Sequence, residues 1–275
     1  EARTPDTKNG AQTGFYPGGE YIFQKHFTAP QAWQGKPVSL VFEGVYQTAL
    51  VYLNGWLLTR NVNGYAEFTV EAGPYLKYGA DNLLKVIADN SLEPNSRWYT
   101  GSGIYRPVRL LVGNKVYLPQ DTVRITTREA DEGFALLDVT AQVQSASTVT
   151  ERVTLQQTIC REGTAVLTDR QNLLLQPGES RTVSFRYCVD SPALWSPENP
   201  NLYTSTMQVL EGEEELDREE TSFGIRTLSI DAAHGVRING QTVKLRGACI
   251  HHDNGILGAA TLPDAEERRI RQLKE

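Results

Sequence analysis

The 275-residue sequence contains no apolar run that approaches the roughly 20 residues needed to cross a lipid bilayer, so we expect no membrane-spanning helix. Its lysines and arginines are scattered singly, and the one basic cluster, Arg268, Arg269 and Arg271, lies among acidic residues. With a net charge of -6 at pH 7, the chain lacks the positive field with which nucleic-acid-binding proteins hold phosphates. Neither a membrane nor a nucleic acid is therefore an expected partner.

Cysteine is scarce, and the three residues present, Cys160, Cys188 and Cys249, are far apart. They form neither a Cys-x-x-Cys pair nor the disulfide framework of a small secreted domain. Two interpretations stay open. Cys160 and Cys188 could form a bridge within one domain, or, as we favour, all three are small buried thiols that pack like apolar residues.

The first ten residues are polar and lack the apolar core of a signal peptide. The sequence therefore does not decide between a cytoplasmic location and a periplasmic or secreted one.

Alternation with a period of two residues is abundant. Residues 21–27, 137–143 and 183–189 each alternate between apolar or aromatic side chains and polar ones, as antiparallel strands with one buried face do. Asn54-Gly55 and Asn239-Gly240 supply the positive φ angles that tight hairpin turns require. Many short strands at close spacing predict an all-β fold built from sandwiches.

Composition changes near residues 115–119 and 224–229 divide the chain into three segments, 1–115, 116–226 and 227–275. Within the second segment, the acidic run from Glu211 to Glu220 predicts a solvated hairpin or loop. Helical signals appear only in the third segment. There, Asp264 and Glu267 have the spacing of a capping box, and Ile270 and Leu273 begin an apolar stripe that ends with the chain at Glu275. A helix that stops so early predicts a truncated domain.

Four blocks, in their order and spacing, resemble the family 2 glycoside hydrolases, with β-galactosidases as the branch most similar. The blocks are FEGVY at 42–46 with VYLNG at 51–55, RWYTGSGIYRPV at 97–108, LWSPENPNLY at 194–203 with FGIR at 223–226, and residues 238–253 from ING through LRG to HHD. The resemblance implies a jelly-roll sandwich over 1–115, an immunoglobulin-like sandwich over 116–226, and the first strand and helix of a truncated TIM barrel over 227–275.

Family members usually carry several strands and a Pro-His-Asp-Trp segment before the region that corresponds to residues 18–21. Because only about fifteen residues precede that region here, we expect the first domain to expose apolar surface or unpaired strand edges.

Retaining glycosidases need two carboxyl groups about 5 Å apart, one to protonate the leaving oxygen and one to attack the sugar. In the family, both are glutamates on later barrel strands. A TIM barrel takes about 250 residues, far more than 227–275 provides. The resemblance therefore implies that this chain contains no catalytic residue, that both glutamates lie downstream, and that the chain alone is inactive.

The candidate substrate-binding residues are His251, Asp253 and Arg97. His251 matches a substrate-side histidine of the family, at the end of a predicted strand over 247–253, and Asp253 follows on the same face. The alternative is a structural histidine. Although a His-His-Asp cluster can suggest a metal, no further ligand is identifiable by spacing, so we expect neither metal nor cofactor in this segment.

Arg97 stands where several family members have an aspartate that contacts the sugar. Two interpretations have equal weight: an arginine that donates hydrogen bonds to sugar hydroxyls or recognises a charged neighbour, and a surface arginine paired with an acid. The departure puts the galactoside-binding details of those members in doubt for this chain.

The predicted function is the N-terminal part of a retaining hydrolase of β-galactosides, with a carbohydrate as partner. A β-glucuronidase of the same family and a non-catalytic carbohydrate-binding or adhesive pair of sandwiches are the alternatives. Residues 235–275 favour the enzyme, because a binding module has no need of a hairpin followed by a strand and a helix start. The sequence leaves the oligomeric state open, a homo-oligomer included.

Overall fold

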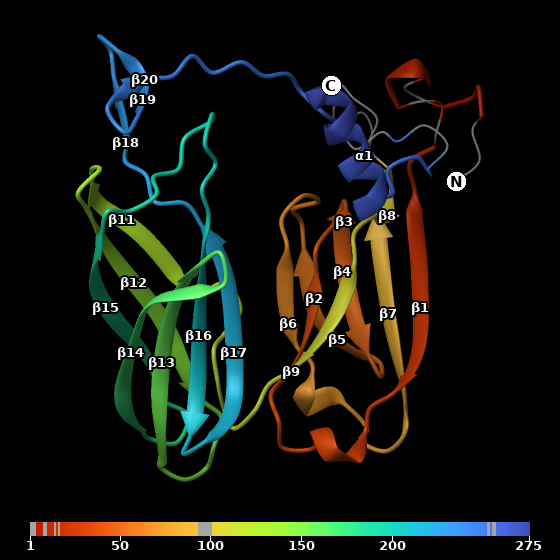
Figure 1. Ribbon diagram of the computed structural model, residues 1–275. Helices are drawn as coiled ribbons and strands as arrows, with labels where there is room; N and C mark the ends of the chain where they lie inside the picture. The colour runs from red at the N-terminus through yellow and green to blue at the C-terminus, as the bar shows by residue number, and fades with distance from the viewer. Residues whose placement is uncertain are drawn as a thin grey trace. The chain divides into compact units, whose positions relative to one another are not determined.

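A computed structural model describes residues 4–7, 10–13, 15, 17–92, 101–251, 254 and 257–275 (Figure 1). The chain divides into two compact units, Glu1–Val112 with Ala248–Glu275, and Gly113–Gly247. The described part is mostly antiparallel β-structure with one C-terminal helix, which confirms the predicted fold class at this level. The three segment boundaries placed on the sequence stay predictions.

The first unit contains a sandwich of two sheets, with strand orders β1-β7-β4-β5 and β6-β2-β9, and the short pair β3-β8. Its strands are β1 (Glu20–Thr28), β2 (Val38–Phe42), β3 (Val45–Tyr46), β4 (Thr48–Leu53), β5 (Trp56–Asn61), β6 (Phe68–Glu71), β7 (Asp81–Asp89), β8 (Gly103–Ile104) and β9 (Val108–Val112). Its short 3-10 helices are η1 (Gly10–Thr13), η2 (Gln31–Trp33) and η3 (Gly73–Tyr75).

Alternate residues of the two sheets of the first unit meet in one core. On β4 the buried side chains are Ala49, Val51 and Leu53, and β2 contributes Val38, Leu40 and Phe42 from the facing sheet. Phe42 stacks on Phe68 with ring centroids 4.9 Å apart. Each fully buried aliphatic or aromatic side chain stabilises the unit by roughly 1.5–3 kcal/mol, so this alternation is what holds the two sheets face to face.

The sandwich is open along one side. β1 and β9 are the terminal strands of their sheets in the described part, and β1 is exposed along most of its length. A groove of about 640 Å³ lies between them and is lined mainly by apolar side chains, among them Phe23, Phe27 and Trp33. The described part of the first unit therefore exposes apolar surface along this side.

The second unit is a larger sandwich. One sheet has the order β14-β13-β16-β17, and in the other β12 pairs with β10, β11 and β15. The strands are β10 (Val116–Tyr117), β11 (Arg124–Ala130), β12 (Phe134–Ser145), β13 (Glu151–Arg161), β14 (Thr164–Leu175), β15 (Ser180–Asp190), β16 (Tyr203–Glu211) and β17 (Glu214–Phe223). The alternation read in 137–143 and 183–189 is confirmed, because Leu137, Val139, Val183 and Phe185 are all buried.

The turn predictions are also confirmed. Asn54 and Gly55 join β4 to β5 with φ angles of 52° and 91°. Asn239 and Gly240 join β19 (Gly235–Ile238) to β20 (Gln241–Thr242) with φ angles of 51° and 77°. Two successive positive φ angles are the requirement that Asn-Gly meets with little strain. The acidic run from 211 to 220 forms the exposed β16–β17 hairpin.

Both interpretations of the cysteines are wrong. All three thiols are free, Cys160 is half-buried, and Cys188 and Cys249 are exposed. The reason lies in the strand alternation: on β15 the odd-numbered residues from Val183 to Val189 face the core, so Cys188 points to the outer face.

A small three-stranded sheet follows the second sandwich, formed by β18 (Leu228–Asp231), β19 (Gly235–Ile238) and β20 (Gln241–Thr242). The strand predicted over 247–253 does not form in its described part, because residues 247–251 belong to no strand. A parallel barrel strand depends on hydrogen bonds to neighbouring strands, and none of the described strands pairs with this segment.

The predicted C-terminal helix is present as α1 (Pro263–Lys274), but the prediction of a capping box formed by Asp264 and Glu267 is wrong. The N-cap is Leu262, and no side chain caps the helix. Pro263 occupies the first turn, where its missing N–H costs nothing, and this moves the helix start ahead of Asp264. Asp264 and Glu266 instead place negative charge near the positive end of the helix dipole.

One ion-pair network in the second unit gives a stability prediction. Lys115 Nζ lies 2.8 Å from a Glu211 carboxylate oxygen and 3.1 Å from one of buried Glu151. The Ser147 hydroxyl and the Lys115 ammonium hold the pKa of Glu151 below its ordinary value. This stabilisation is therefore complete above the unfolded-state pKa of about 4.3 and is lost as the pH falls through the lower folded-state pKa.

We expect Lys115→Met to lower the free energy of unfolding at pH 7 by about 1–2 kcal/mol, because Glu151 is left buried without its cation while part-exposed Lys115 is screened by water. Urea unfolding at a series of pH values measures the effect, with exposed Lys36→Ala as the control. The difference between wild type and Lys115→Met should shrink below pH 4. A difference that is independent of pH would contradict the network.

Candidate functional site

The C-terminal segment meets the sandwich of the first unit at the end where β3 and β8 lie, and Figure 1 shows α1 at this end. The backbone N–H of Thr261 donates a 3.1 Å hydrogen bond to the carbonyl of Tyr105, which directly follows β8. Buried Asn90 lies at the same end, where its backbone N–H donates to the Gly19 carbonyl and its amide donates to the Ser102 hydroxyl.

Two contacts fix the side chain of Tyr105. Its ring fills the space in front of Gly44, where a Cβ would come within 2.6 Å of the ring, so this close approach requires glycine. Its hydroxyl donates a 2.9 Å hydrogen bond to the Gly64 carbonyl, and burial raises the pKa of the phenol. Tyr105 therefore offers a rigid backbone carbonyl to Thr261.

His251 lies between Ala248 and α1, belongs to no helix or strand, and has an exposed side chain. Arg269 of α1 donates a 2.8 Å hydrogen bond to the His251 carbonyl and a second one to the Asn254 side-chain oxygen. The Asn254 amide donates in turn to Glu266 at 2.6 Å, and Glu266 forms an ion pair with Arg269. Two helix residues three apart thus hold the loop that presents His251.

Glu266 and Arg269 were missed as functional residues by sequence analysis. Their i, i+3 spacing is a signal for an intrahelical pair, but it does not reveal that the pair also binds the preceding loop. Of the predicted site residues, only His251 lies within the described part of the chain. Arg97 and Asp253 lie outside the described residues, so a substrate site made of the three stays a prediction.

The LWSPENPNLY block has a structural role in the second unit. The guanidinium of Arg226 lies 4.5 Å from the Trp195 ring centroid, a favourable cation–π distance. The backbone N–H of Trp195 donates to the Ile225 carbonyl, and the backbone carbonyl of Trp195 accepts a 3.0 Å hydrogen bond from the Asn239 side-chain amide. A cleft of about 880 Å³ lies beside it, lined by polar and apolar residues of the 196–201 loop and of the hairpin from 238 to 244.

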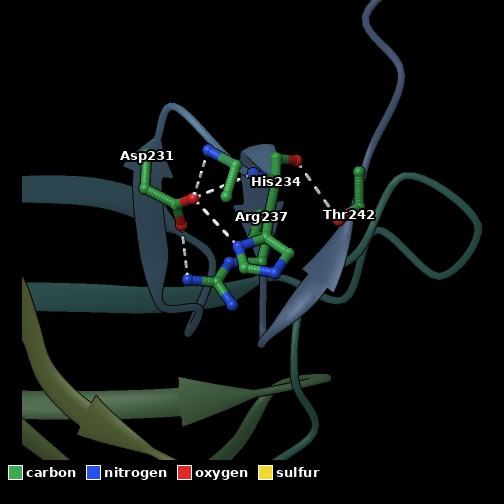
Figure 2. A network of polar contacts seen from close by, with 5 residues as sticks. Asp231, His234, Arg237 and Thr242 are labelled. Carbon is green, nitrogen blue, oxygen red and sulfur yellow. Dashed lines mark hydrogen bonds and ion pairs between the residues drawn. The ribbon is translucent and has the colours of Figure 1, made fainter.

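A histidine and an aspartate also meet on the small hairpin sheet (Figure 2). One Asp231 oxygen accepts the backbone N–H groups of Ala233 and His234 and contacts the His234 ring nitrogen at 2.9 Å, while the other accepts Arg237 at 2.6 Å. The backbone N–H of His234 contributes most to a lowered pKa of Asp231. Because the carboxylate is occupied by the amides of its own turn, this cluster closes the hairpin rather than forming a catalytic pair.

No group of three or more His, Cys, Asp or Glu residues arranged to hold a metal ion occurs in the described part of the chain. Over the same residues, no helix has both the length and the apolar character needed to cross a membrane.

Two family models match the chain. Glycosyl hydrolase 2 galactose-binding domain-like covers residues 6–135, and Glycosyl hydrolases family 2 covers residues 116–226. Among curated relatives, Beta-galactosidase BoGH2A of Bacteroides ovatus is 36% identical over 271 residues, which are 98% of this chain and 32% of that protein. A protein named Putative beta-glucuronidase of Formosa agariphila is 32% identical over 97% of this chain and 25% of its own length.

Solved structures of the same family are similar to this chain. A glycosyl hydrolase family 2 member from Bacteroides cellulosilyticus superposes with a TM-score of 0.91 at 35% identity, covering 99% of this chain and 35% of that one. A β-glucuronidase of Bacteroides uniformis gives a TM-score of 0.88 at 28% identity, covering 96% of this chain and 33% of that one.

This chain therefore spans about a third or less of the length of these relatives. The two family models together run from residue 6 to residue 226, and the superpositions extend to almost the whole chain. The chain belongs to glycoside hydrolase family 2 and corresponds to the N-terminal part of its enzymes.

Proposed function

We propose that the chain is the N-terminal part of a retaining glycoside hydrolase that acts on β-galactosides. The observation that carries the proposal is the 36% identity with Beta-galactosidase BoGH2A over 98% of this chain. In this proposal the first sandwich is a jelly roll, the second is immunoglobulin-like, and residues 227–275 open a TIM barrel. The role of this segment is to support the barrel and to form one wall of the substrate pocket.

His251 is the residue through which this wall would contact the sugar. Its imidazole can both donate and accept a hydrogen bond, which suits sugar hydroxyls. The backbone of His251 is already held by Arg269, so little conformational entropy remains to be lost when a sugar binds. An exposed side chain on a fixed backbone is the arrangement expected of a substrate-binding residue.

The described carboxylates support the assignment of catalysis to a part of the enzyme outside this chain. Burial, together with Asp121 and Asp217 nearby, raises the pKa of Glu219, a property that a general acid needs. However, Glu219 lies on β17 of the second sandwich, and Asp217 accepts the Leu118 backbone N–H at 2.7 Å. Asp217 therefore ties β17 to the start of the second unit, and we assign a catalytic role to neither Glu219 nor Asp217.

We predict that the 275-residue chain alone has no glycosidase activity, because a retaining mechanism needs two carboxyl groups about 5 Å apart. Purified chain is assayed on aryl β-galactoside, β-glucuronide and β-mannoside, beside the longer protein that contains it. Turnover of any of the three by the pure chain would contradict the proposal. Their relative turnover by the longer protein identifies its substrate.

We predict that His251→Ala in the longer enzyme lowers kcat/KM for its best aryl glycoside by about 30- to 100-fold, a loss of roughly 2–3 kcal/mol of transition-state stabilisation. His26→Ala is the control, since His26 is an exposed histidine on β1 that pairs with Asp81. An unchanged kcat/KM for His251→Ala would reduce His251 to a structural residue.

Arg269→Ala should lower kcat/KM by about tenfold, because it frees the loop that carries His251 without removing the imidazole. Arg271→Ala, on the same helix but paired with Glu267 in solvent, should leave kcat/KM unchanged. If Arg269 acts through His251, adding Arg269→Ala to His251→Ala should cost less than tenfold. If the two losses in kcat/KM were fully additive, Arg269 and His251 would act independently of each other.

A β-glucuronidase is the second candidate. Two observations favour it: the 32% identity with the protein named Putative beta-glucuronidase, and the presence of Arg97 where several family members have an aspartate. A guanidinium can bind a carboxylate through two parallel hydrogen bonds, and a glucuronide carries such a carboxylate. The activity ratio of the two aryl glycosides decides between the candidates.

A further inference from the structure

Two aromatic rings are exposed together at the end of the first unit that is remote from Tyr105. Trp56 begins β5 and is 65% exposed, and Tyr75 ends η3 and is 37% exposed. Their ring centroids are 6.4 Å apart and their planes are inclined by 48°. The pair therefore forms a shallow, twisted aromatic surface open to solvent.

The strand register places this pair far from the candidate site. β4 begins opposite Asp89, next to Asn90 at the Tyr105 end, and finishes with Leu53 opposite Leu84. Trp56 pairs with Leu53 at that far end. Six residues of strand span about 20 Å, so one sugar ring cannot contact both Trp56 and the Tyr105 end.

One asparagine anchors the turn before Trp56 and the backbone of Tyr75. The Asn54-Gly55 turn leads directly into Trp56, and the Asn54 amide donates to the Tyr75 carbonyl at 2.8 Å. The same amide donates to Asn82 at 2.8 Å, and the Asn54 side-chain oxygen accepts the Leu83 N–H at 3.1 Å. Since Asn82 is fully buried, the backbones that carry the rings are anchored to the core. A surface that is already ordered loses little entropy when it binds a ligand.

The size of the surface decides what kind of ligand it suits. A Trp and a Tyr bury about 150–250 Å² each even when fully covered, so together they offer less than the roughly 800 Å² that each partner contributes to a stable protein interface. A pyranose ring is matched in size to one aromatic ring. Its C–H groups carry partial positive charge and meet the negative face of an aromatic ring favourably.

We propose that Trp56 and Tyr75 form an accessory binding surface for a β-linked polysaccharide, one sugar ring stacking on each aromatic ring. This surface goes beyond the proposed hydrolase function and does not depend on a catalytic barrel. It would hold the polymer while another part of it is cleaved.

Affinity electrophoresis tests the proposal, with hydroxyethylcellulose, pectic galactan or α-linked dextran in the gel. We expect at least one of the two β-linked polymers to retard the protein, and dextran to have no effect. Trp56→Ala and Tyr75→Ala should each weaken the binding by at least about tenfold. Leu57→Ala, which removes an exposed side chain next to Trp56, is the matched control and should bind like the wild type.

Absence of retardation by both β-linked polymers would overturn the proposal, and so would unchanged retardation of the Trp56→Ala/Tyr75→Ala double variant. Thermal melting shows whether each variant is folded. A second measurement needs no substitution: tryptophan fluorescence of the wild type should change saturably with the binding polymer and not with dextran. A fluorescence signal that does not respond to the β-linked polymers would also overturn the proposal.

The experiment separates this surface from the hydrolase proposal. In the longer enzyme, Trp56→Ala should leave hydrolysis of a small aryl glycoside unchanged, because such a substrate does not extend to the aromatic pair. A longer enzyme without hydrolase activity would refute the proposed function while leaving polymer binding intact. If Trp56→Ala and Tyr75→Ala lose polymer binding but keep aryl-glycoside hydrolysis, the result supports the accessory binding surface and leaves the hydrolase proposal untouched.

Discussion

The packing of Tyr105 against Gly44 is the constraint on which the first unit depends at the end that carries the candidate site. It brings β8 against β3, and through the Tyr105 carbonyl it fixes Thr261 and with it the segment that leads into α1. The contact works because glycine has no side chain, because the phenol finds the Gly64 carbonyl, and because a buried ring excludes water from both. The link between Tyr105 and Thr261 is therefore made of backbone atoms, next to one buried aromatic ring.

The two ends of the first sandwich differ in the kind of groups that they carry. At the Tyr105 end, polar backbone groups of 19, 64 and 105 all have partners, and the loop carrying His251 is held by a charged network on α1. At the other end, a tight turn presents aromatic faces to water. Strands that run the length of the sandwich connect both ends through one apolar core, so each end can vary while the core stays the same.

The sequence predicted the β-rich fold, the hairpin turns and the C-terminal helix because these depend on local patterns. Val139 and Phe185 face the core as their alternation requires, and Asn54 and Asn239 adopt the positive φ angles that their turns need. The errors arose where a local pattern competed with a wider context. Pro263 moved the start of α1. The alternation of residues along β15 places Cys188 on the outer face, although cysteine as a residue type favours burial.

The candidate site was less predictable, since its contacts join residues far apart in sequence. Family likeness indicated His251, but not that Glu266 and Arg269 hold its loop, nor that Tyr105 anchors Thr261 across more than 150 positions. No periodicity encodes such contacts.

The Asn54 hydrogen bonds have a further consequence for the chemical lifetime of the protein. Asn-Gly is the sequence most prone to spontaneous deamidation, in which the glycine nitrogen attacks the asparagine amide carbon and forms a succinimide. Attack requires the side chain to rotate toward the following backbone nitrogen, yet at Asn54 both ends of the amide are engaged by Tyr75, Asn82 and Leu83. The bonds that anchor the backbone beside the aromatic pair thus also protect this turn from deamidation.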